Sequence, residues 1–258
     1  MIRLIRVELL KIRTTRLSYG LLATGAGLTA LFSVIEANSA GGSGGYSPSG
    51  LYTQTGFGAV ISGGIWALVL ATVFGVTVST GEFRHHTATL TYLAAPGRSR
   101  VLAAKAVAGA LTGGVFGLAG FAIPLVAALG FTAGKGYRVP LSDATMASYG
   151  AGYLLAGALL AAIGVAVGAL VRSQLAAVIG VFAWTIIIES LIGGMFTSVR
   201  PYLPYTAATT MAGSTLGGAA FGPAHGVDGG TPLPFLAVAA LLVGIAAALS
   251  AIAAGTVV

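Results

Sequence analysis

Residues 147–170, ASYGAGYLLAGALLAAIGVAVGAL, form one uninterrupted stretch without a charged side chain. An α-helix rises about 1.5 Å per residue, so about 20 residues cross the roughly 30 Å of hydrocarbon in a bilayer. This stretch is therefore long and apolar enough to span a membrane, and comparable stretches precede and follow it. The sequence predicts six membrane-spanning helices, at residues 17–38, 58–80, 104–131, 147–170, 175–197 and 233–256.

The composition agrees with a membrane protein. Of 258 residues, 56% are hydrophobic and 7% are charged, whereas about a quarter of the residues in a soluble domain are charged. We therefore expect an all-α membrane protein whose residues 1–258 form a single domain. The net charge of +7 does not indicate nucleic-acid binding, because the charges flank the spans. The chain has no cysteine, which excludes disulfides, thiolate metal sites and cysteine nucleophiles.

The basic residues are distributed unequally between the segments that connect the spans. Cytoplasmic segments of membrane proteins are enriched in lysine and arginine. Ten of the thirteen basic residues lie before span one, between spans two and three, or after span four, and three lie on the other side. The sequence therefore predicts a multi-pass protein with both termini in the cytoplasm. The ten are Arg3, Arg6, Lys11, Arg13, Arg16, Arg84, Arg98, Arg100, Lys105 and Arg172.

Residues 1–16 have the pattern of an amphipathic helix. Four apolar residues recur at helical spacing while the arginines point elsewhere, which favours a helix lying along the cytoplasmic face of the membrane. A basic tail without fixed structure is the alternative. The apolar set is Ile2, Ile5, Leu9 and Ile12.

Residues 81–103 form the longest predicted cytoplasmic segment. Their first half predicts a short amphipathic helix that ends at Pro96-Gly97 and offers a partner an aromatic anchor and charges. Adjacent side chains diverge on a helix, so the histidine pair does not predict a metal site. The residues expected to contact a partner are Glu82, Phe83, Arg84, His85, His86, Thr87 and Leu90.

Two features are expected toward the outer side of the membrane. Glu189 lies inside span five, where a carboxylate costs roughly 2.5–3.5 kcal/mol on insertion scales; pairing, protonation or contact with a substrate would offset this cost. Residues 198–232 contain four prolines, yet 205–221 are mostly small or apolar. We expect this segment to dip back into the membrane or to pack over the bundle, and a compact external cap without gating is the alternative.

Glycines recur every fourth residue in spans three and four, a spacing that lets helices approach closely. We interpret them as packing surfaces. They are Gly109, Gly113 and Gly117 in span three, and Gly164 and Gly168 in span four.

Three segments resemble the permease subunits of bacterial ABC type-2 exporters, especially actinobacterial ones. They are ELLKIRT at 8–14, GEFRHHTATLTYLAAPGRSRVLAAK at 81–105, and Tyr202-Leu203-Pro204. The six-helix plan, the cytoplasmic termini and the basic amphipathic start match the family along nearly the whole chain. The carboxyl end, Thr256-Val257-Val258, departs from it because it lacks a basic tail.

The resemblance implies a type V ABC exporter fold in the bacterial plasma membrane. Residues 1–16, with Glu8, Lys11 and Arg13, would be the elbow helix, and 82–96 would be the coupling helix. Two permeases, identical or homologous, would assemble with two ATPase subunits that bind ATP and Mg²⁺. This chain would have no catalytic residue and no cofactor of its own. It would move an amphipathic small molecule, peptide or lipid outward. Its translocation path or gate would include Glu189, Tyr202 and Pro204.

Two other classes remain open. An ion-coupled secondary transporter needs buried ionisable groups near the membrane midplane, and Glu189 is the one candidate. An intramembrane hydrolase needs a nucleophile paired with a base. Ser214 and His225 both lie in the predicted external segment, but no acidic residue is evident to orient the histidine.

Overall fold

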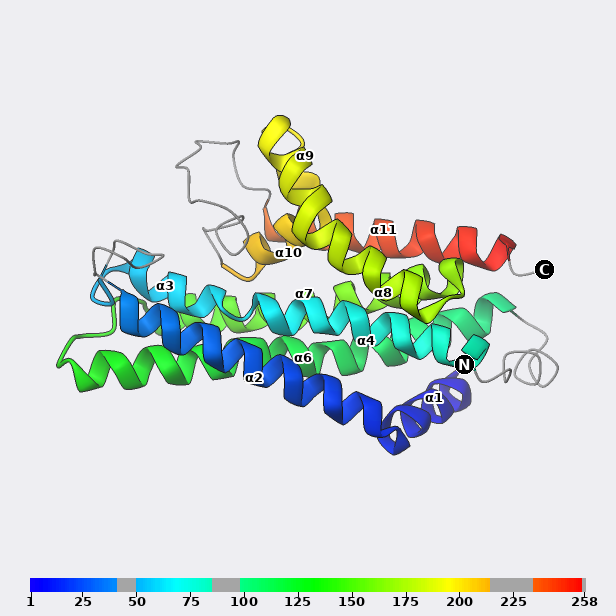
Figure 1. The fold of residues 1–258 in the computed structure, drawn as a ribbon, viewed down its shortest axis with the longest axis horizontal. Helices are drawn as coiled ribbons and strands as arrows, with labels where there is room; N and C mark the ends of the chain where they lie inside the picture. Colours follow the sequence, from blue (N-terminus) through cyan, green and yellow to red (C-terminus); the bar gives the residue numbers. More distant parts are fainter. Residues whose placement is uncertain (41–49, 85–97, 214–233, 257–258) are drawn as a thin grey trace.

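A computed structural model describes residues 1–40, 50–84, 98–213 and 234–256. These ranges are helical and contain no strand. Figure 1 shows the helices gathered into an elongated bundle. The helices are α1 (Ile2–Thr14), α2 (Arg16–Ser39), α3 (Gln54–Ser62), α4 (Ile65–Arg84), α6 (Arg98–Gly134), α7 (Asp143–Val171), α8 (Gln174–Ala183), the π-helical turn η1 (Trp184–Ile188), α9 (Glu189–Met195), the 3-10 turn η2 (Arg200–Tyr202), α10 (Pro204–Met211) and α11 (Phe235–Thr256).

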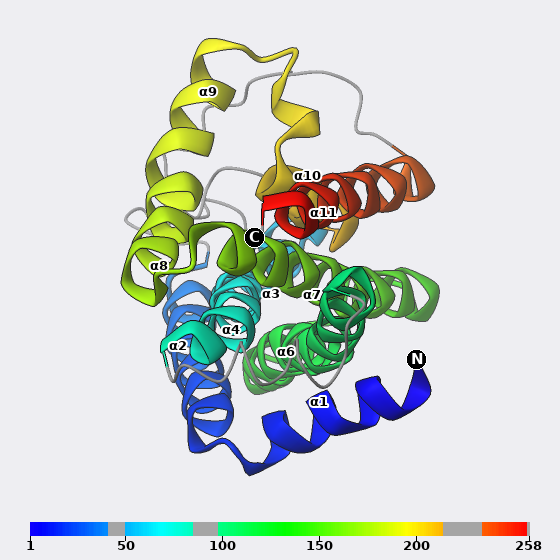
Figure 2. The same cartoon turned by 90° about the vertical axis from the view of Figure 1, so that its right-hand side faces the viewer.

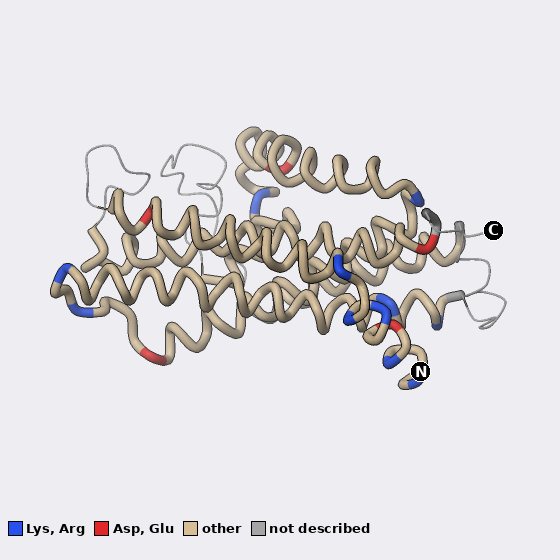
Figure 3. The backbone as a smooth tube through the Cα atoms, turned by 60° about the horizontal axis from the view of Figure 1, so that its bottom comes forward, with Lys and Arg blue, Asp and Glu red and all other residues tan. Residues whose placement is uncertain are grey.

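The described residues contain six helical stretches that are long and apolar enough to cross a membrane, which confirms the predicted helical class and the number of spans. α1 and the carboxyl end of α11 lie at the same end of the bundle, here called the terminal end (Figure 1). Figure 3 shows most lysines and arginines gathered there. The six stretches are Arg16–Ser39, Gln54–Glu82, Ser99–Gly134, Asp143–Val171, Gln174–Met195 and Phe235–Gly255.

Glycines hold α4, α6 and α7 at very short separation. A Cβ atom at Gly117 in α6 would overlap the backbone carbonyl of Tyr153 in α7, and one at Gly164 in α7 would overlap that of Thr72 in α4. Such approaches favour van der Waals contact along the helix backbones, the main source of helix association in lipid. The predicted glycine surfaces therefore pack inside the chain, and α7 packs against both α4 and α6.

The second span is interrupted, whereas the sequence predicted one helix. α3 ends before Gly63 and Gly64, whose N–H groups donate to carbonyls three residues earlier. The carbonyl of Ile61, which accepts from Gly64, also accepts a 2.7 Å hydrogen bond from the hydroxyl of Tyr153, which is 1% exposed. Tyr153 thereby supplies a second donor to the backbone at the break, where lipid could supply none.

Replacing Tyr153 with phenylalanine tests this contact. Tyr153→Phe keeps the ring but removes the donor to Ile61, so we expect a loss of about 1 kcal/mol in stability, measured as a lower thermal unfolding midpoint in detergent. Tyr52→Phe is the matched control, because Tyr52 is 63% exposed and its hydroxyl makes no hydrogen bond among the described residues. Equal midpoints for the two variants would contradict the expectation.

The segment after span five folds back onto the bundle, one of the two arrangements predicted for it. α10 packs against α7 and α11. Its Tyr205 is buried and donates a 2.5 Å hydrogen bond to the Thr72 hydroxyl inside α4. The described part of this segment is therefore docked on the helix bundle; residues 214–233 lie outside the described ranges.

Candidate functional site

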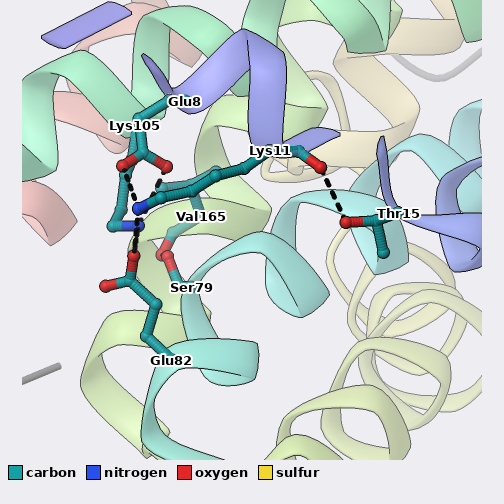
Figure 4. Close-up of polar contacts among 7 residues, drawn as sticks. All are labelled: Glu8, Lys11, Thr15, Ser79, Glu82, Lys105 and Val165. Carbon is teal, nitrogen blue, oxygen red and sulfur yellow. Dashed lines mark hydrogen bonds and ion pairs between the residues drawn. The ribbon is translucent and has the colours of Figure 1, made fainter. Parts of the chain in front are cut away.

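Two glutamates and two lysines meet where α1, α4 and α6 come together at the terminal end (Figure 4). Lys105 of α6 bridges Glu8 of α1 at 3.1 Å and Glu82 of α4 at 2.5 Å. Lys11 of α1 contacts the same two carboxylates, at 2.8 Å and 3.0 Å. We call these four residues the ion cluster. Its two positive and two negative charges balance.

Helical spacing explains how α1 contributes two members. Glu8 and Lys11 are three residues apart, so their side chains lie on neighbouring rows of one helix face. Ile12 on that face is buried against the bundle. The amphipathic pattern of residues 1–16 therefore places Glu8, Leu9 and Ile12 against the protein, whereas Ile2 is exposed. α1 forms as predicted, and the alternative of an unstructured tail is wrong for Ile2–Thr14.

The cluster contains one member that is almost inaccessible to water. The side chain of Lys105 is 4% exposed, compared with 7% for Glu8, 12% for Glu82 and 47% for Lys11. A buried ammonium is tolerated when carboxylates surround it, because the loss of hydration is offset by close opposite charges. Lys105 thus needs both glutamates, whereas Lys11 also contacts solvent.

The pKa of Lys11 gives the cluster a defined pH dependence. Burial alone would lower this pKa, but hydrogen bonds to Glu8 and Glu82 outweigh burial and raise it above the usual 10.5. A raised pKa contributes stability that is complete below pH 10.5 and is lost as the pH rises through the higher value. We expect the difference in unfolding midpoint between the wild type and Lys11→Met to be constant near neutral pH and to shrink above pH 10.5. A difference that stays constant at higher pH would contradict this.

The structure brings together residues that the sequence assigned to separate helices. Glu8 and Lys11 were expected in the elbow helix and Glu82 in the coupling segment, and all three join the ion cluster. Glu82 lies in the last turns of α4, so the span continues through the start of the expected coupling helix. Arg13 is exposed and is not a cluster member.

Other predicted contact residues are only partly described. Phe83 and Arg84 belong to the last turn of α4. The remaining four, His85, His86, Thr87 and Leu90, lie outside the described residues. Lys105 was not predicted as a site residue, because its position was interpreted only as that of a basic residue that orients the spans. The sequence feature that could have identified Lys105 is a lysine several residues inside an apolar helix.

A second polar site surrounds Glu189. This residue follows the π-helical turn of span five, is 4% exposed, and accepts a 2.6 Å hydrogen bond from the backbone N–H of Thr206 through Oε1. Thr206 lies in the first turn of α10. A carboxylate from span five therefore caps α10. Oε2 is buried and has no hydrogen-bond partner among the described residues. Pro204 begins α10, and Tyr202 is 54% exposed.

Two substitutions separate the capping role of Glu189 from its charge. Glu189→Gln keeps a side-chain oxygen for the Thr206 N–H and removes the buried charge, so we expect an unfolding midpoint equal to or above that of the wild type. Glu189→Ala leaves the amide uncapped and should lose about 0.5–2 kcal/mol, as at other helix caps. Thermal unfolding in detergent measures both. Equal destabilisation by Gln and Ala would show that the hydrogen bond to α10 is not the stabilising contact.

Neither site resembles a metal centre. Within the described ranges, no group of three His, Cys, Asp or Glu side chains lies close enough to hold a metal ion. The class that fold and site support is a multi-pass helical membrane protein with a charged cluster at one end of its bundle. No protein-family model matches the chain, and no curated protein matches it.

Proposed function

We propose that this chain is the membrane-spanning subunit of an ATP-driven ABC exporter of type V fold, with both termini in the cytoplasm of a bacterium. The ion cluster is the observation that carries the proposal. It ties α1 to the end of α4 and the start of α6, the two helices that flank residues 85–97. A partner that displaces this segment would therefore also exert force on α1, α4 and α6.

In this proposal, another chain supplies the energy. The sequence has no GxxxxGK[ST] motif for binding nucleotide phosphates. Six candidate spans account for most of the described residues. In the proposed assembly, two permeases, identical or homologous, bind two ATPase subunits that supply ATP and Mg²⁺. Closure of the ATPases shifts the helices and moves an amphipathic molecule outward.

The function is tested by capturing the partner from native membranes. The chain has no cysteine, so Thr87→Cys introduces a single cross-linking site in the segment expected to contact the ATPase. We expect this variant to cross-link to a protein with a nucleotide-binding motif, and the purified complex to hydrolyse ATP with sensitivity to vanadate. Ala144→Cys is the matched control, because Ala144 is exposed in the first turn of α7, at the end of this helix that lies away from the terminal end.

Recovery of the chain alone, without ATPase activity, would overturn the proposal. It would favour an ion-coupled carrier, the second candidate, which one observation supports: the buried Oε2 of Glu189 without a partner. Transport driven by an ion gradient and abolished by Glu189→Gln would then identify that class.

A further inference from the structure

Four arginines near the start of the chain lie on the surface. They form no ion pair with a carboxylate among the described residues. Their positive charge is therefore directed toward whatever surrounds the terminal end. They are Arg3, Arg6, Arg13 and Arg16, and all four are exposed.

The ion cluster explains why these arginines stay unpaired. Glu8 is the only acidic residue before Glu36, and it points inward to Lys11 and Lys105. No carboxylate on α1 is left for the arginines. The same contacts also fix the rotation of α1 about its own axis.

That rotation directs the three arginines of α1, which are Arg3, Arg6 and Arg13, away from the bundle. With 3.6 residues per turn, Arg6 and Arg13 share one row of the helix, and Arg3 and Leu10 share the adjacent row. These rows lie opposite the buried Glu8 and Ile12. Leu10 is 62% exposed and Val7 is 51% exposed. The outward face therefore alternates guanidinium groups with apolar side chains.

The position of α1 suits a membrane surface. Figure 2, which looks along the bundle, shows α1 running crosswise below α6 rather than parallel to the spans. The Tyr19 hydroxyl of α2 donates a 3.1 Å hydrogen bond to the carbonyl of Arg13, which joins the two helices at the bend. Because α2 spans the membrane, α1 is held near the depth of the lipid headgroups.

We propose that the outward face of α1 binds the phosphate groups of anionic phospholipids in the leaflet at the terminal end. Guanidinium groups match phosphate oxygens in charge and geometry. Val7 and Leu10 would enter the boundary between headgroups and acyl chains, as the apolar face of an interfacial helix does. A purely acidic protein surface would satisfy the arginines but leave these two side chains in water. The inference does not depend on an ATPase partner.

The test measures which lipid lies next to α1 in the full chain. Thr14→Cys, exposed on α1, carries a fluorescent label in protein reconstituted into phosphatidylcholine vesicles. A nitroxide-bearing phosphatidylglycerol or phosphatidylcholine is then added at equal mole fraction. We expect stronger quenching by the anionic lipid, because each basic residue near an anionic surface favours binding by roughly fivefold. High salt should weaken the preference, since the Debye length falls to about 3 Å at 1 M.

Two charge variants give the control. Arg3→Gln with Arg6→Gln should lower the preference for phosphatidylglycerol severalfold. Lys135→Gln with Arg138→Gln removes the same charge from exposed positions beyond α6, at the other end of the bundle, and should leave it intact. Equal quenching by both lipids with the wild-type arginines, or an unchanged preference without Arg3 and Arg6, would overturn the inference. Loss of the preference on adding inorganic phosphate at constant ionic strength would also overturn it, by showing a site for free phosphate.

Discussion

Lys105→Met should destabilise the protein by about 3 kcal/mol. The substitution removes the ammonium group between Glu8 and Glu82, which remain as two nearly buried carboxylates with only the half-exposed Lys11 to neutralise them. Breaking a buried ion pair by removing one partner typically costs 3–5 kcal/mol, and we place this variant at the lower end because Lys11 remains. The thermal unfolding midpoint in detergent measures the loss.

A compensated variant distinguishes loss of charge balance from loss of packing. Combining Lys105→Met with Glu8→Gln and Glu82→Gln removes the unpaired carboxylates while keeping similar side-chain volumes, so most of the stability should return. Lys135→Met is the matched control, because Lys135 is exposed beyond the end of α6. If the triple variant is no more stable than Lys105→Met alone, charge balance is not what the cluster supplies.

Gly117→Ala should separate two helices of the core. The new methyl group would overlap the backbone carbonyl of Tyr153 and lie 3.1 Å from the Cα of Leu154. Both obstacles are backbone atoms, so no side-chain rotation relieves them and α6 must move away from α7. Overpacking of this kind typically costs 1–3 kcal/mol, again measured as the unfolding midpoint.

Gly130→Ala is the matched control in the same helix. A Cβ atom at Gly130 has no neighbouring atom within 4 Å, and alanine favours a helix over glycine by up to about 1 kcal/mol. The control should therefore be neutral or more stable than the wild type. Destabilisation by both variants alike would contradict a specific close approach at Gly117.

The spans could be predicted from sequence because hydropathy reports directly on membrane crossing. Each of the six predicted stretches coincides with a helical span, and the bounds differ by a few residues at most ends. Hydropathy does not report how the backbone runs inside a span. The break at Gly63–Gly64 and the π-helical turn at Trp184–Ile188 leave the average apolarity of their spans unchanged, so both were missed.

The ion cluster could be predicted only in part. The amphipathic pattern identified the helix that carries Glu8 and Lys11, and the charge at the end of span two identified Glu82. Their meeting depends on how α1 folds back across α6, a tertiary contact that no local pattern encodes. Lys105 was counted as a topology signal because a lysine near the end of a span looks the same whether it faces headgroups or two carboxylates.

The close packing of α4, α6 and α7 has a consequence for synthesis of the protein. These helices belong to spans two, three and four, which leave the ribosome one after another, and the glycine contacts among them involve no later span. The glycine contacts among these three helices therefore need no part of the chain that follows α7. Spans five and six are synthesised after all three helices, so a glycine substitution at one of these contacts would act on the nascent chain as well as on the finished protein.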